Sequence, residues 1–241
     1  MKNNQTRFLI FGQGRSGSAL LKELLNSHPN ISCDGELFNK DTLYIPNKYL
    51  LEAAQYFPLP YIIYRQLIHR NRVYGFTLFI HHVKRIGRRI KYLSDRNWKI
   101  VYIRRVDTLH QSFSNIVAQE TAIWHRRKDE EKEIPEFQLT ISKERLFHQL
   151  RVRERWLEKE RKVLDGLPFF EVVYEDMLKD NTCWQETMQH VFGFLGVDNA
   201  PVSSGLLKSY PKPYADIVTN YEELVKSVKN SPYSYMLRQA I

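Results

Sequence analysis

Short apolar runs alternate along the chain with longer amphipathic segments. Four of the runs, 8–11 (FLIF), 73–80 (VYGFTLFI), 99–103 (KIVYI) and 169–174 (FFEVVY), are rich in β-branched and aromatic residues. Runs of this length and composition are typical of buried strands. We therefore predict four strands, with a shorter extended piece at 30–33.

Between the runs, apolar residues recur at helical spacing. Leu109, Phe113 and Ile116 share one face of a helix that is predicted to begin near Asp107. Further helices are predicted after residue 18, over most of 126–165 with a hydrophilic loop before Pro135, over 181–195 and over 221–228, with irregular helix and loop over 42–72. Strands that alternate with helices favour an α/β fold with a parallel sheet, whose ligands bind where strands turn into helices.

The bulk composition predicts one globular domain that covers residues 1–241. At 43% hydrophobic and 26% charged residues, the chain has enough apolar material for a core. Because no apolar run approaches about 18 residues, we expect neither membrane insertion nor a signal peptide, and a cytoplasmic location. Cys33 and Cys183 have no metal-ligand spacing and are expected to be reduced thiols.

The charge is basic and unevenly spread. The chain has 36 Lys and Arg against 27 Asp and Glu, and residues 65–105 hold twelve of the basic residues with Asp95 as the one acid. Such a block indicates an anionic partner. A basic surface alone does not decide whether that partner is nucleic acid, an anionic membrane or a phosphorylated small molecule.

The segment GQGRSGS, residues 12–18, follows the first predicted strand and opens a helix. Backbone N–H groups and the helix dipole converge on an anion at such a turn. The spacing Gly12-x-Gly14-x-x-Gly17 also fits the dinucleotide fingerprint, with Glu36 at the place of the ribose-binding acid. The Walker A pattern fails, because Ser18 stands where that loop needs Lys. A third interpretation is a loop for sulfuryl transfer, in which Arg15 stabilises charge on the leaving phosphate.

Residues 8–38 resemble the opening of the PAPS-dependent sulfotransferase family, especially its bacterial carbohydrate branch. The match to that family's 5′-phosphosulfate loop is Arg15-Ser16-Gly17-Ser18, while Ala19 departs from the Ser or Thr that many members carry. The resemblance implies a P-loop NTPase-like three-layer α/β fold with a central parallel sheet. It also implies one sulfotransferase domain that moves the sulfuryl group of 3′-phosphoadenosine 5′-phosphosulfate (PAPS) to a hydroxyl, expected to be a carbohydrate's. Adenosine 3′,5′-bisphosphate (PAP) would remain.

The resemblance extends to further cofactor contacts. Arg104 at a strand end and Ser112 eight positions later resemble the family's 3′-phosphate motif, and Tyr174 in VVYEDM matches a tyrosine near the adenine. In the C-terminal stretch KSYPKPYADIVTNYEEL, Lys212 or Lys208 is the candidate to reach the cofactor.

An acceptor hydroxyl needs a base, because its pKa lies far above neutrality. Glu36 in GELF matches the glutamate base of carbohydrate sulfotransferases. His81, which follows the second apolar run, is the next candidate, as animal cytosolic members use histidine. Thr77 replaces a lysine that the family often carries there.

Three alternatives stay open from the residues. A dinucleotide-dependent oxidoreductase would use the same first loop, a nucleic-acid-binding module would use the basic block, and a degenerate family member would bind PAPS without transferring. The sulfotransferase interpretation implies a small-molecule or glycan hydroxyl acceptor, no nucleic acid and no metal, and leaves a homodimer open.

Overall fold

The computed structural model describes residues 5–39, 47–69, 71–129 and 136–237. The chain forms two compact units. The first contains Met1–Arg104 and Glu158–Ser204, and the second contains Arg105–Leu157 and Gly205–Ile241.

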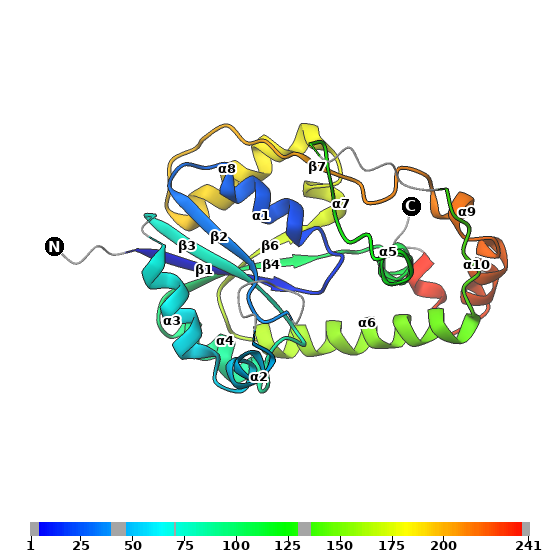
Figure 1. Cartoon of the computed structure of the whole chain (residues 1–241), viewed down its shortest axis with the longest axis horizontal. Coiled ribbons are helices and arrows are strands. Elements are labelled where there is room, and N and C mark those ends of the chain that lie inside the picture. The colour runs from blue at the N-terminus through cyan, green and yellow to red at the C-terminus, as the bar shows by residue number, and fades with distance from the viewer. Residues whose placement is uncertain (1–4, 40–46, 70, 130–135, 238–241) are drawn as a thin grey trace. The chain divides into compact units, whose positions relative to one another are not determined.

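A parallel sheet of five strands organises the first unit (Figure 1). The strands are β1 (Thr6–Gly12), β2 (Ile31–Glu36), β3 (Val73–Phe79), β4 (Trp98–Arg104) and β6 (Phe169–Val173), in the order β2-β3-β1-β4-β6. The predicted strands and their parallel arrangement are therefore confirmed. Because all five strands are parallel, their carboxyl ends lie at the same edge of the sheet.

Helices cover both faces of this sheet. They are α1 (Ser18–Asn26), α2 (Lys48–Tyr56), α3 (Pro58–Ile68), α4 (Ile86–Ser94), α7 (Tyr174–Met177) and α8 (Trp184–Leu195). Figure 1 shows α1 and α8 above the sheet and α3 and α4 below it. The apolar side chains of α1 and α8 pack with those of β1, because Leu21, Val191 and Phe192 join Phe8 and Ile10 in one buried cluster. The predicted α/β fold with helices flanking a central parallel sheet is thus confirmed.

The second unit is mostly helical. It contains α5 (Thr108–Thr121), α9 (Tyr214–Ile217), α10 (Tyr221–Lys229), a short 3₁₀ helix (Ser234–Leu237) and the antiparallel pair β5 (Arg126–Arg127) and β7 (Leu206–Leu207). The helix α6 (Lys143–Leu164) begins in this unit. Leu109, Phe113 and Ile116 are buried together, as their spacing predicts.

Two regions differ in detail from the prediction. The stretch expected to be irregular contains two regular helices, because Asn47 caps α2 by accepting from the N–H groups of Tyr49 and Leu50. Pro58 and Pro60 lie in the first turn of α3, where a missing N–H costs nothing. The helix expected within 126–165 begins only at Lys143, and Pro135 lies outside the described residues. No helix of the described residues has the length and apolarity that crossing a bilayer requires.

Candidate functional site

The loop between β1 and α1 has the features of an anion-binding turn. Arg15 (φ 66°) and Gly17 (φ 94°) both have left-handed backbone conformations, and α1 starts directly after them at Ser18. No side chain caps the N-terminus of this nine-residue helix, and its first turn contains no acidic residue. The positive end of the α1 dipole is therefore available to an anion.

The two serine hydroxyls of the loop differ in their contacts. The Ser16 hydroxyl, which is fully buried, donates to the Gln13 carbonyl at 2.7 Å. Gln13 in turn donates from Nε2 to the buried carboxylate of Glu160 at 3.2 Å. The hydroxyl of Ser18 makes no hydrogen bond to any described residue, and Ala19 follows it, partly exposed. Ser18 is thus the better placed of the two hydroxyls to bind a ligand.

The ring of Tyr174 lies against this loop. Tyr174 begins α7 where β6 ends, and a Cβ atom built on Gly17 would lie 2.5 Å from its Cδ2. The structure therefore brings Tyr174 and the loop together, whereas the family resemblance predicted only that Tyr174 lies near the adenine. Its contact with adenine stays a prediction.

Glu36 ends β2 opposite Thr77, and Asn39 and His82 both lie against its carboxylate. Its Oε2 accepts from Asn39 Nδ2 at 2.7 Å and lies 3.5 Å from His82 Nε2. His82 Nδ1 accepts the backbone N–H of Phe79, so in the neutral ring the proton sits on Nε2 and points toward Glu36. The Glu36 side chain is 27% exposed, which leaves it accessible to an acceptor.

The side chain of Phe79 lies close to both the His82 ring and the loop. Its ring lies 4.9 Å from the His82 ring, centroid to centroid, and its Cε2 would be 3.7 Å from a Cβ atom on Gly14. The exposed His81 places its ring 4.8 Å from that of His82. Sequence reasoning gave no role to Phe79, and it chose His81 over His82. The available signal was the position of all three at the end of β3.

Arg104 ends β4 at the same edge of the sheet, and its Nε donates to Glu171 Oε1 at 2.6 Å. The other predicted cofactor contacts lie in the second unit. Ser112 is buried in α5 and donates to the Thr108 carbonyl at 2.8 Å. Lys212 pairs with Glu136 at 2.6 Å, and this hydrogen bond raises the pKa of its ammonium group. The roles of Arg104, Ser112 and Lys212 in cofactor binding stay predictions.

Comparison with solved structures identifies the fold. A sulfotransferase from Alicyclobacillus acidocaldarius matches with a TM-score of 0.55 at 15% identity, over 98% of this chain and 94% of that one. Mouse sulfotransferase SULT7A1 complexed with PAP matches with a TM-score of 0.49 at 11% identity, over 98% and 88%. The sulfotransferase domain of the Synechococcus PCC 7002 olefin synthase matches with a TM-score of 0.43 at 17% identity, over 91% and 84%.

The likeness to the Alicyclobacillus protein shows that this chain has the P-loop-like α/β fold of a sulfotransferase, as predicted. No protein-family model matches the sequence, and no curated protein matches it either.

Proposed function

We propose that the protein transfers the sulfuryl group of PAPS to an acceptor hydroxyl, leaving PAP. The observation that carries the proposal is the edge of the sheet at which an uncapped helix N-terminus, the Arg15 loop and the Glu36 carboxylate occur together. The shared fold of the Alicyclobacillus sulfotransferase supports it.

The loop binds the 5′-phosphosulfate. Gly17 allows the left-handed conformation that shapes the loop, and Ser18 supplies a hydroxyl donor. Arg15 supplies a permanent positive charge, because a guanidinium stays protonated at any ordinary pH. That charge stabilises the phosphate oxygen from which the sulfur departs, since this oxygen becomes more negative in the transition state.

Glu36 is the general base. As the acceptor oxygen forms its bond to sulfur and the bond from sulfur to the phosphate oxygen breaks, the hydroxyl proton passes to the Glu36 carboxylate. The contacts of Asn39 and His82 with Oε2 hold the Glu36 carboxylate in place as it accepts the proton.

Arg104 binds the 3′-phosphate in this proposal. Its present partner is the partly exposed Glu171, and the doubly charged phosphate is a stronger acceptor for a guanidinium than one carboxylate. The acceptor is proposed to be a carbohydrate hydroxyl, which rests on the match of Glu36 to the base of the carbohydrate branch.

The strand order weighs against the dinucleotide-dependent oxidoreductase. In the dinucleotide fold the second strand lies beside the first, whereas β2 here is an edge strand and β3 lies between it and β1. Binding of PAP in preference to NAD would separate the two functions directly.

Transfer of labelled sulfate from PAPS to a panel of glycans and small alcohols tests the proposal. Glu36→Gln should retain PAP affinity and lose about 100-fold or more in turnover, the usual scale for a general base. Arg15→Ala should lose both affinity and turnover. The control is Glu158→Gln, which removes a carboxylate from an exposed position of α6 and should transfer normally. Normal turnover of Glu36→Gln would move the base to another residue, and absence of PAP binding in the wild type would refute the function.

A further inference from the structure

Two helices of the first unit expose apolar side chains that a folded protein ordinarily buries. On α3 these are Ile63, Tyr64, Leu67 and Ile68, and on α2 and the residue after it they are Tyr49, Leu50, Tyr56 and Phe57. We call these eight residues the α2–α3 face. Leu67 is 73% exposed, Phe57 72% and Tyr49 79%. Eight of the eleven exposed large hydrophobic residues among the described residues lie on these two consecutive helices and Phe57 between them, and large exposed apolar surfaces mark interaction sites.

The orientation of α3 is fixed by its polar side. Arg65 binds both carboxylate oxygens of Asp34 on β2, at 2.8 and 3.0 Å. Gln66 donates to the Gln5 side chain at 3.1 Å. Because these polar contacts face the sheet, the apolar positions 63, 64, 67 and 68, which share one side of the helix, must face outward. The exposed apolar stripe is thus built into the sequence of α3.

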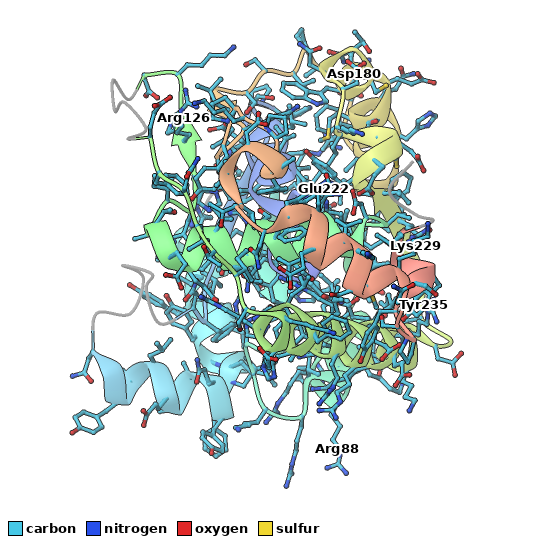
Figure 2. All side chains as sticks on the ribbon, turned by 90° about the vertical axis from the view of Figure 1, so that its right-hand side faces the viewer. Arg88, Arg126, Asp180, Glu222, Lys229 and Tyr235 are labelled. Carbon is cyan, nitrogen blue, oxygen red and sulfur yellow. The ribbon has the colours of Figure 1, made fainter. Side chains whose placement is uncertain are left out.

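Basic residues border the α2–α3 face. The exposed Lys84 places Nζ 6.0 Å from the centre of the Tyr56 ring, and its backbone N–H donates to the Gln55 carbonyl. Arg89 donates to the Tyr56 carbonyl at 2.9 Å. An open hollow of about 420 Å³ is formed by the next residues of the chain. It is lined by Arg85, Ile86, Gly87 and Arg88 together with Lys159. Figure 2 shows Arg88 extending outward from the ribbon.

We propose that the α2–α3 face docks on an anionic lipid bilayer, with its aromatic and aliphatic side chains in the interface and the basic border on lipid phosphates. Tyr, Phe and Leu beside Lys and Arg are the residues that lie at membrane surfaces. The charges are complementary to such a surface, because residues 81–94 contain five Lys and Arg and no acid, and 47–68 contain Glu52 as the one acid. The attachment is peripheral, and it is independent of the proposed transfer reaction.

Vesicle flotation of the full chain tests this surface. Vesicles of phosphatidylcholine with about one third phosphatidylglycerol should bind the wild type at least about tenfold better than phosphatidylcholine alone, since each basic residue near an anionic surface adds severalfold to binding. Phe57→Ser with Leu67→Ser should lower binding to the anionic vesicles about tenfold by removing apolar contact. Lys84→Glu with Arg88→Glu should abolish the preference for anionic vesicles.

Matched variants control for folding and for net charge. Lys179→Glu with Lys226→Glu changes the net charge equally at exposed positions elsewhere, and Tyr235→Ser removes another exposed aromatic ring. Both should bind as the wild type does, and all variants should keep the wild-type circular dichroism and melting temperature.

The proposal fails if the wild type does not float with anionic vesicles, or if the Phe57/Leu67 variant floats equally well. It also fails if light scattering shows a dimer that this variant dissociates while vesicles bind neither protein. The partner that covers the α2–α3 face would then be a second copy of the chain.

Discussion

At the residue scale, position 17 has two requirements that only glycine satisfies together. Its backbone has φ 94°, and the Tyr174 ring occupies the space where a Cβ atom would lie. A side chain here would both strain the backbone and push Tyr174 away from the loop. The contact thus couples the loop after β1 to the end of β6.

Gly17→Ala should therefore lower the free energy of unfolding by about 2 kcal/mol, the scale of a left-handed non-glycine residue with an added clash. PAP affinity should fall with it, because the loop can no longer keep its conformation. Chemical denaturation and calorimetry measure the two effects. The control is Gly193→Ala, within helix α8 and with no atom within 4 Å of the new Cβ, which should stabilise by about 0.5–1 kcal/mol. Equal effects of the two substitutions would contradict this account of Gly17.

The candidate site was predictable only where it is local in sequence. Arg15, Gly17 and Ser18 occur within one turn, so their proximity follows from their spacing, while their role in binding stays a prediction. The contact between His82 and Glu36 depends on the pairing of β2 with β3 and on a register shift between Asp34 and Glu36. The sequence contains no sign of that shift, and this is why it did not distinguish His82 from His81.

At the scale of elements, one buried carboxylate joins α3 to the edge of the sheet. Asp34 on β2 accepts from Arg65 of α3 and from the Tyr74 hydroxyl of β3, the latter at 2.8 Å. The Nε2 atom of His69 lies 3.3 Å from Asp34 Oδ1, and its Nδ1 atom forms a hydrogen bond with the Ser32 hydroxyl. This cluster positions the polar side of α3 and with it the α2–α3 face.

Asp34→Ala should destabilise the protein by about 3 kcal/mol, because it leaves the largely buried Arg65 guanidinium without its carboxylate. Asp95→Ala breaks the exposed pair with Lys91 and should cost less than about 0.5 kcal/mol. Urea denaturation of both variants checks the difference. A cost for Asp34→Ala as small as that for Asp95→Ala would mean that the cluster contributes little to the attachment of α3.

The strands were predictable because each is a compact apolar run bounded by polar residues. Helices α2 and α3 were harder to predict, since prolines usually interrupt helices and here Pro58 and Pro60 lie in a first turn. The outward apolar side of α3 was also unforeseen. Which side of an amphipathic helix faces the core depends on partners such as Asp34 that lie far away in sequence.

At the scale of the whole molecule, two buried tyrosines give the stability a dependence on alkaline pH. Burial and the neighbouring Asp34 carboxylate raise the pKa of Tyr74, and burial and Glu160 raise that of Tyr102. In the unfolded chain both tyrosine hydroxyls have a pKa of about 10. The folded state therefore keeps protons that the unfolded state releases, so stability is complete below pH about 10 and falls as the pH rises further.

The double variant Tyr74→Phe with Tyr102→Phe should lose the part of this dependence that the two tyrosines contribute. Its unfolding free energy is expected to be lower than that of the wild type at pH 7, since two hydrogen bonds worth about 1 kcal/mol each are lost. Between pH about 9 and 11 it should decline less steeply. Denaturant titrations across that range provide the measurement, and equal slopes for both proteins would contradict the assignment.

The division into two units could not be predicted from the sequence. The second unit combines 105–157 with 205–241, and neither boundary has a linker composition that would reveal it. The alternation of strands and helices predicted the sheet of the first unit, because local periodicity determines it. The prediction of one domain over residues 1–241 stays a prediction.

The central position of β1 in the sheet also determines when this strand can pair during synthesis. It leaves the ribosome before the other strands of the sheet, yet its neighbours are β3 and β4, and the second of these ends at Arg104. At about 5–20 residues per second, the nascent FLIF segment waits on the order of ten seconds for both partners. During synthesis this apolar strand therefore stays without its sheet neighbours for that time, so the strand of the sheet that is made earliest is paired late.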